Sequence, residues 1–199
     1  MSRDNGEVVG QMGRFTCRIV NDTDPQSPED WGDTTAFLMG WDSRNFWVGH
    51  EKGSRLTPQE CIDKWKDTHH VFLLEAYIHS GIVLALMNEG NFCDRQWDVS
   101  SGIGAVFLDK KEWKTKSQKA WKRARALVKE WNQFLCGDVW GYCIDEHQTD
   151  DLESEVIDKS VESCWGFYGS EYAKEEGLSM LKCVAEKADE IPTLKAVGA

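Results

Sequence analysis

VFLLEAYIHSGIVLALM, residues 71–87, is the stretch that decides the fold. Two runs rich in β-branched and aromatic residues, 71–79 and 82–87, meet at Ser80 and Gly81, and we expect Gly81 to supply the positive φ of a tight turn. The stretch therefore predicts a β-hairpin. Apolar residues fall on both faces of each run, so we expect two central strands with cover on both sides.

Further strands and helices are predicted on both sides of this hairpin. Thr57, Pro58 and Glu60 form a helix start, with a capping residue, a proline in the first turn and a capping box. Ser170 caps the last helix, in which Gly177 weakens the middle. The predicted strands are 14–20, 35–41, 71–79, 82–87, 103–108, 139–144 and 156–167, and the predicted helices are 57–68, 117–135 and 171–190.

This order of elements predicts an α+β fold. Because neighbouring strands are joined by hairpins, we expect a mainly antiparallel sheet of about six or seven strands with about three helices. The chain of 199 residues fits a single domain. We place that domain at 14–191, between a flexible N-terminal tail at 1–13 and a C-terminal tail at 192–199.

Composition limits the classes of function. A net charge of −11 argues against general affinity for nucleic acid or anionic lipid. Seven cysteines, an odd number without paired spacing, favour reduced thiols in a cytoplasm, and the polar N-terminus does not look like a signal peptide. No apolar run is long enough to span a bilayer. We predict no metal site and no cofactor, and the oligomeric state is left open.

Charge is segregated along the chain. Residues 109–130 carry nine Lys or Arg against three acids, whereas 138–190 carry fifteen acids against four Lys. One interpretation is a strip with Lys119 and Arg123 that binds a phosphate-bearing molecule or an acidic partner, with tryptophans among the cations. The alternative is that the basic helix face lies against the chain's own acidic part or is simply solvated.

Two groups of residues have the right chemistry for a site. The first joins the hairpin tip to the loop that follows it, and its members are Tyr77, His79, Ser80, Cys93, Trp97 and Asp98. If the loop folds back, His79 meets Asp98 and a thiol or hydroxyl, which is the skeleton of a nucleophilic site. The alternative is that these side chains only satisfy turn hydrogen bonds.

The second group lies in CWGFYG at 164–169, just before the last helix, and contains Trp165 and Tyr168. Its aromatic rings predict a recognition surface, next to a helix N-terminus that can receive an anion. The alternative is a tight turn closed by aromatic packing.

Several short motifs occur in order along residues 21–175. They are NDTDP at 21–25, YIHSGI at 77–82, FC at 92–93, WD at 97–98, SGIG at 101–104, GDVWGY at 137–142 and SCWGFYG at 163–169. Together they resemble a family of uncharacterised proteins of tailed bacteriophages and prophages. Two departures stand out: Ile78 replaces the Asp that the family has before His79, and the Trp-Asp-Ser-Gly segment is longer here. The resemblance implies a phage origin and carries no biochemical activity.

We therefore expect a phage-encoded accessory protein that acts in the cytoplasm of the infected host cell. It binds a host protein or a small nucleotide and inhibits a host antiviral defence. The expected binding residues are Tyr77, His79, Ser80, Trp97, Asp98, Trp165, Tyr168, Lys119 and Arg123. One alternative is a small hydrolase or transferase that uses His79 with Asp98 or with a cysteine such as Cys93. Another alternative is a component of the virion or of its assembly.

Overall fold

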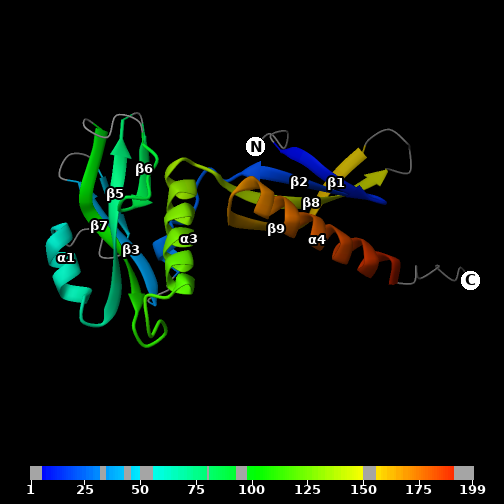
Figure 1. Ribbon diagram of the computed structural model, residues 1–199. Coiled ribbons are helices and arrows are strands. Elements are labelled where there is room, and N and C mark those ends of the chain that lie inside the picture. The colour runs from blue at the N-terminus through cyan, green and yellow to red at the C-terminus, as the bar shows by residue number, and fades with distance from the viewer. Residues whose placement is uncertain are drawn as a thin grey trace, which may run out of the picture. The chain divides into compact units, whose positions relative to one another are not determined.

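The structure is a computed structural model, and it describes residues 6–31, 35–42, 46–49, 56–79, 81–92, 98–149 and 156–190. The chain divides into two compact units. Unit 1 contains Met1–Pro25 and Asp138–Ala199, and unit 2 contains Gln26–Gly137. Unit 2 is thus inserted into the chain of unit 1 (Figure 1).

Unit 2 is built on a five-stranded antiparallel sheet with the order β4-β3-β7-β5-β6. Its strands are β3 (Ala36–Asp42), β4 (Phe46–Gly49), β5 (His69–Ile78), β6 (Ile82–Leu86) and β7 (Val99–Asp109). A short 3-10 helix, η1 (Pro28–Trp31), precedes β3. The predicted hairpin is present as β5 and β6. A hydrogen bond from His79 N to Gly81 O (3.2 Å) lies at its turn.

Two helices cover the two faces of this sheet, α3 (Gln118–Leu135) on one and α1 (Pro58–Trp65) on the other (Figure 1). Alternate residues of β3 separate the two cores, because Leu38 packs beneath α3 and Phe37 beneath α1. The predicted capping box starts α1: Thr57 Oγ1 accepts from Glu60 N, and a Glu60 carboxylate oxygen accepts from Thr57 N at 2.7 Å.

β6 lies at the edge of the sheet, so the expectation that both hairpin strands are central is wrong for this strand. Its outward backbone edge is met by a side chain of α3. Asn132 Oδ1 accepts from Leu84 N and Asn132 Nδ2 donates to Leu84 O, both at 2.8 Å. The amide thus pairs with Leu84 as a neighbouring strand would, which protects an exposed edge from other chains.

Unit 1 is a four-stranded antiparallel sheet with the order β1-β2-β8-β9 and one helix. Its elements are β1 (Glu7–Met12), β2 (Phe15–Asn21), β8 (Val139–Thr149), β9 (Val156–Tyr168) and α4 (Ser170–Glu190). α4 lies along this sheet (Figure 1). The core between the sheet and α4 holds Cys17 and Ile19 from β2, Tyr142 from β8, and Ala173 and Leu181 from α4.

Gly177 lies at the closest approach of α4 to this sheet. A Cβ atom at this position would be 2.8 Å from Cys17 Sγ and 2.9 Å from Tyr142 Cβ. Such distances are shorter than any ordinary carbon contact, so a larger residue forces helix and sheet apart. The glycine that costs helix propensity therefore allows α4 to seat on β2 and β8.

The predicted α+β class, the antiparallel pairing and the three helices are confirmed within the described residues. The residues that the structure describes contain nine strands instead of six or seven, and these strands form two sheets instead of one. Residues 7–12, predicted as part of a tail, form β1. The range 14–191, predicted as one domain, is divided between the two units, and the tail at 192–199 lies outside the described residues.

Candidate functional site

One end of the unit 2 sheet gathers polar and aromatic side chains on the α1 face. Val71 on β5 packs in the core beneath α1, and the period of two along a strand places Glu75, Tyr77 and His79 on that same face. β5 pairs with β6 without interruption over this stretch, so the alternation is kept. This end of the sheet lies beyond the part that α1 covers, as Figure 1 shows.

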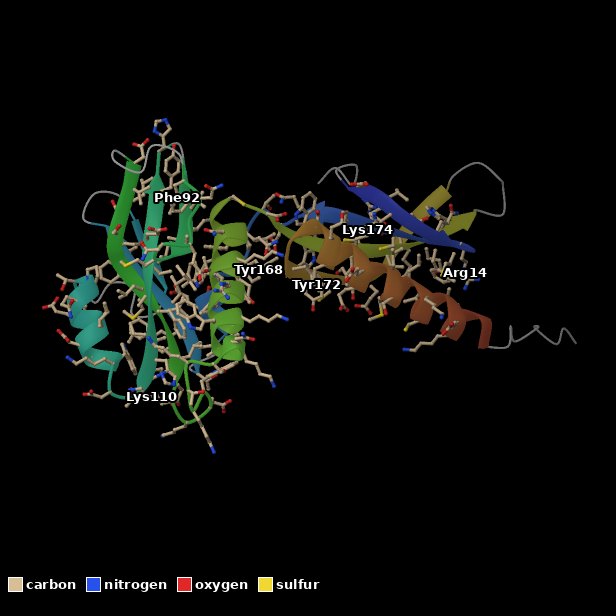
Figure 2. The ribbon with its side chains drawn as sticks, viewed as in Figure 1. Arg14, Phe92, Lys110, Tyr168, Tyr172 and Lys174 are labelled. Atoms are coloured by element: carbon tan, nitrogen blue, oxygen red, sulfur yellow. The ribbon has the colours of Figure 1, made fainter. Side chains whose placement is uncertain are left out.

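Three rings follow one another at this end. Tyr77 stacks on Phe92 with ring centroids 5.7 Å apart and on His79 at 6.2 Å. Figure 2 labels Phe92 at this end of unit 2. The outermost ring is the most accessible, since the His79 side chain is 65% exposed. The stack therefore presents an imidazole ring to water.

Asp98 approaches the free end of this stack. Its Oδ2 lies 3.4 Å from His79 Nδ1, and its side chain is 27% exposed. Asp98 comes directly before β7, and Val99 pairs with Tyr77 across the sheet, so strand register brings the carboxylate to the imidazole. A carboxylate at this distance favours a proton on Nδ1 and leaves Nε2 as the outward nitrogen.

Glu75 is the buried member of the group, with only 1% of its surface exposed. Its Oε1 accepts a hydrogen bond from Gly90 N at 3.0 Å. A Cβ at Gly90 would lie 2.7 Å from that oxygen and 2.2 Å from a ring carbon of Phe92. The hydrogen bond from Gly90 to Glu75 thus holds the loop so that Phe92 stacks on Tyr77. Only glycine fits at position 90.

The sequence prediction placed part of this group correctly. His79 and Asp98 do meet, as the folding-back of the loop required. Ser80, Cys93 and Trp97 lie outside the described residues. Glu75 and Phe92 were missed, although Glu75, Tyr77 and His79 alternate along a predicted strand and that spacing alone indicates a shared face.

The other predicted residues do not belong to this group. Lys119 lies on the exposed side of α3, and Arg123 Nη1 donates to Glu130 Oε1 at 3.1 Å on the same helix. Trp165 and Tyr168 are part of unit 1. The Trp165 side chain is 47% exposed and lies against Gly141, where a Cβ would be 2.3 Å from the indole.

The turn after β9 is closed by aromatic packing, as the second interpretation of CWGFYG required. Phe167 stacks on Tyr142 at 5.7 Å and meets Tyr172 of α4 edge-on at 5.4 Å. Gly166 and Gly169 have positive φ of 87° and 94°, which explains the two glycines. Tyr168 is half-buried, so Trp165 is the more accessible ring for a partner.

Two cysteines of the unit 1 sheet are poorly suited to nucleophilic chemistry. Burial raises the pKa of the Cys17 thiol to about 11, and burial also raises the pKa of the Cys143 thiol. Both thiols are therefore largely protonated at neutral pH. Because the thiolate is the reactive form, neither is a good nucleophile. Over the ranges that the structure describes, no group of three or more His, Cys, Asp or Glu side chains is arranged to hold a metal ion.

Protein-family models, curated proteins and solved structures were compared with the chain, and none of them matches it. No helix among the described residues is long and apolar enough to cross a membrane.

Proposed function

We propose that this chain acts by binding a protein of the host, as a phage accessory protein of the kind that its motifs resemble, and that it thereby inhibits a host antiviral defence. The binding surface is the ring stack of Phe92, Tyr77 and His79 together with Asp98. In this proposal the protein works in the cytoplasm of the infected cell.

The observation that carries the proposal is the exposed His79 ring, which stacks on Tyr77 and lies beside Asp98. Aromatic residues that are held in place before binding lose little conformational freedom on association, which is why such side chains dominate binding energies at protein interfaces. His79 is 65% exposed and rests on Tyr77, which in turn rests on Phe92. A group in open water suits a protein surface better than a small nucleotide, which is usually enclosed in a pocket.

The test places a photo-crosslinking amino acid at position 83 in the full chain expressed in a bacterial host, and identifies what is captured by mass spectrometry. Val83 pairs with Tyr77 across the hairpin and is 45% exposed, so the label lies beside the stack and His79 is kept. The captured protein is then purified, and its affinity is measured for the wild type, His79→Ala and Asp98→Ala. We expect a loss of about tenfold or more for His79→Ala, in the range of an interface hot spot. The matched control is Tyr172→Ala, which removes an aromatic ring that is 52% exposed in the other unit.

Equal affinity of wild type and His79→Ala for the captured protein refutes this surface. Equal losses for His79→Ala and Tyr172→Ala refute it as well, because the effect is then not specific to the stack. Circular dichroism of each variant excludes unfolding as the cause.

The contact between His79 and Asp98 also favours a second function, a small hydrolase or transferase. An imidazole oriented by a carboxylate can take a proton from a nucleophile at Nε2. Asp98→Asn keeps the shape but reverses the preferred tautomer, so a panel of ester, phosphoester and amide substrates should show turnover that falls steeply in this variant. Turnover that persists in both His79→Ala and Asp98→Asn excludes the dyad as its source.

A further inference from the structure

Unit 2 has a hollowed surface between α3 and the edge strand β6, away from the ring stack. One hollow of about 360 Å³ has Leu84, Leu86 and Val128 among its lining residues, and a second of about 580 Å³ has Gln118 and Trp121. Glu89 and Arg125 line both hollows, so the two meet at this ion pair. Together they form one groove along α3, which we call the α3–β6 groove.

Three cations of α3 lie along the groove. Lys122, Arg125 and Lys129 are all exposed and are spaced at one-turn intervals on one side of the helix. With a rise of 1.5 Å per residue, the row extends over about 10 Å. A single phosphate group meets only one turn of such a row, whereas linked phosphate groups can contact all three cations at once.

The middle cation is held in place before any ligand arrives. Glu89 accepts from Arg125 Nε at 2.7 Å and from Nη2 at 2.6 Å. The guanidinium also lies 5.5 Å from the centre of the Trp121 ring. Among the described residues no acceptor meets Arg125 Nη1, so this nitrogen keeps its donors for a ligand.

The flanking cations differ from other basic side chains of this unit. Lys110 Nζ donates to Lys66 O at 2.7 Å, and Lys116 Nζ donates to Val71 O at 2.7 Å, so both serve the fold. Lys122 and Lys129 have no such bond or ion pair with the part of the chain that the structure describes. Their charges are therefore available in the groove.

The charge of the whole chain limits what this row can attract. Unit 2 has fifteen Lys and Arg against fifteen Asp and Glu, and unit 1 has eight against nineteen, so the net charge of −11 belongs to unit 1. Unit 2 has no net positive charge to attract a long polyanion, because binding of nucleic acid depends on many cations that act together. A short anion that fits between two turns of α3 meets a local excess of positive charge instead.

We propose that the α3–β6 groove binds a small molecule with two or three linked phosphate groups, held by Lys122, Arg125 and Lys129. The site is separate from the ring stack, and it stands whether or not that surface binds a protein. Two sources share this chemistry, an inorganic polyphosphate and a nucleoside polyphosphate. They differ in whether an aromatic base lies against Trp121.

Isothermal titration of the full chain at about 0.1 M salt tests the site with inorganic phosphate, inorganic triphosphate and a nucleoside triphosphate. We expect both triphosphates to bind at least tenfold more tightly than inorganic phosphate. We expect the double variant Lys122→Glu with Lys129→Glu to weaken triphosphate binding at least tenfold. If the nucleoside triphosphate binds more tightly and Trp121→Leu removes the difference, the base of the nucleotide lies against the Trp121 ring. If the two triphosphates bind equally, the groove recognises the phosphate groups alone.

The matched control is Lys111→Glu with Lys114→Glu. It makes the same change in net charge at two exposed lysines of unit 2 that line neither hollow, and we expect less than a threefold effect. The proposal is overturned if the wild type binds neither triphosphate, or if both double variants lose affinity equally. It is also overturned if a single-stranded oligonucleotide binds more tightly than either triphosphate, because the row then serves a polymer. Circular dichroism establishes that every variant is folded.

Discussion

Gly177→Ala sets two effects of opposite sign against each other in the middle of α4. Replacing a glycine by alanine inside a helix normally stabilises a protein by about 1 kcal/mol. Here the new methyl group would lie 2.8 Å from Cys17 Sγ and 2.9 Å from Tyr142 Cβ, and both atoms belong to core residues of strands that α4 covers. A Cβ atom next to the backbone cannot rotate away, so helix and sheet must separate. Forcing an extra methylene into a packed core costs about 1–3 kcal/mol.

We therefore expect Gly177→Ala to lower the stability of unit 1 by up to about 2 kcal/mol, since an overpacking cost of about 1–3 kcal/mol is set against a gain in helix propensity of about 1 kcal/mol. Urea unfolding followed by circular dichroism, together with the rate at which Cys17 is labelled in the native protein, measures the loss. Ser179→Ala is the control, because it raises helix propensity at an exposed position of the same helix and should stabilise slightly.

A double-mutant cycle identifies the contact. Cys17→Ala removes the sulfur atom that the new methyl group meets, so the combined variant should lose less than the sum of the single losses. If Gly177→Ala stabilises the protein as an ordinary Gly-to-Ala change does, the close packing of α4 on β2 and β8 is refuted.

Three further predictions concern other parts of the fold. Asn132→Asp keeps the acceptor for Leu84 N but places a carboxylate against Leu84 O, so unit 2 should lose about 2 kcal/mol in urea unfolding, and an unchanged midpoint contradicts the edge pairing. Burial raises the pKa of Cys17 from 9.0 to about 11, so the contribution of the protonated thiol to the stability of unit 1 is complete below pH 9 and declines as pH rises toward 11. A decline of equal size in Cys17→Ala shows that another group causes the pH dependence. Residues 26–137 expressed alone should fold, with dispersed amide signals in NMR, and a collapsed spectrum argues against an independent unit.

Local signals in the sequence predicted local structure well. The capping box of Thr57 and Glu60 depends on residues three positions apart, and the hairpin of β5 and β6 depends on two adjacent runs. The contact of His79 with Asp98 needed only that the segment after β6 return to the tip of the hairpin. Each of these follows from chemistry within about twenty residues.

Partners that are distant in the chain could not be predicted in this way. Asn21 on β2 pairs with Trp140 on β8, but the hydrophobic pattern of neither strand indicates which strand is its partner. The strands were therefore assigned to one sheet instead of two. Gly177 was interpreted as a weakness because its role depends on Cys17, which lies far away in sequence. In the sequence, Glu75 is a polar residue within an apolar strand. Its role becomes clear only from its hydrogen bond with Gly90 N.

The insertion of unit 2 determines the order in which the protein can be completed on the ribosome. β2 cannot pair with β8 until Glu146, the partner of Phe15, has been synthesised. All strand partners within unit 2, by contrast, are present once residue 137 has left the ribosome. Contacts between residues so far apart form slowly, because closing a long loop costs entropy before any pairing compensates for it. During synthesis, the β2 edge of the β1–β2 hairpin therefore stays unpaired until β8 has been made. Unit 2, which is synthesised in between, can fold during this time. In Asn21→Pro or similar lesions of β2, we expect nascent chains to aggregate through this waiting edge, while the inserted unit still folds.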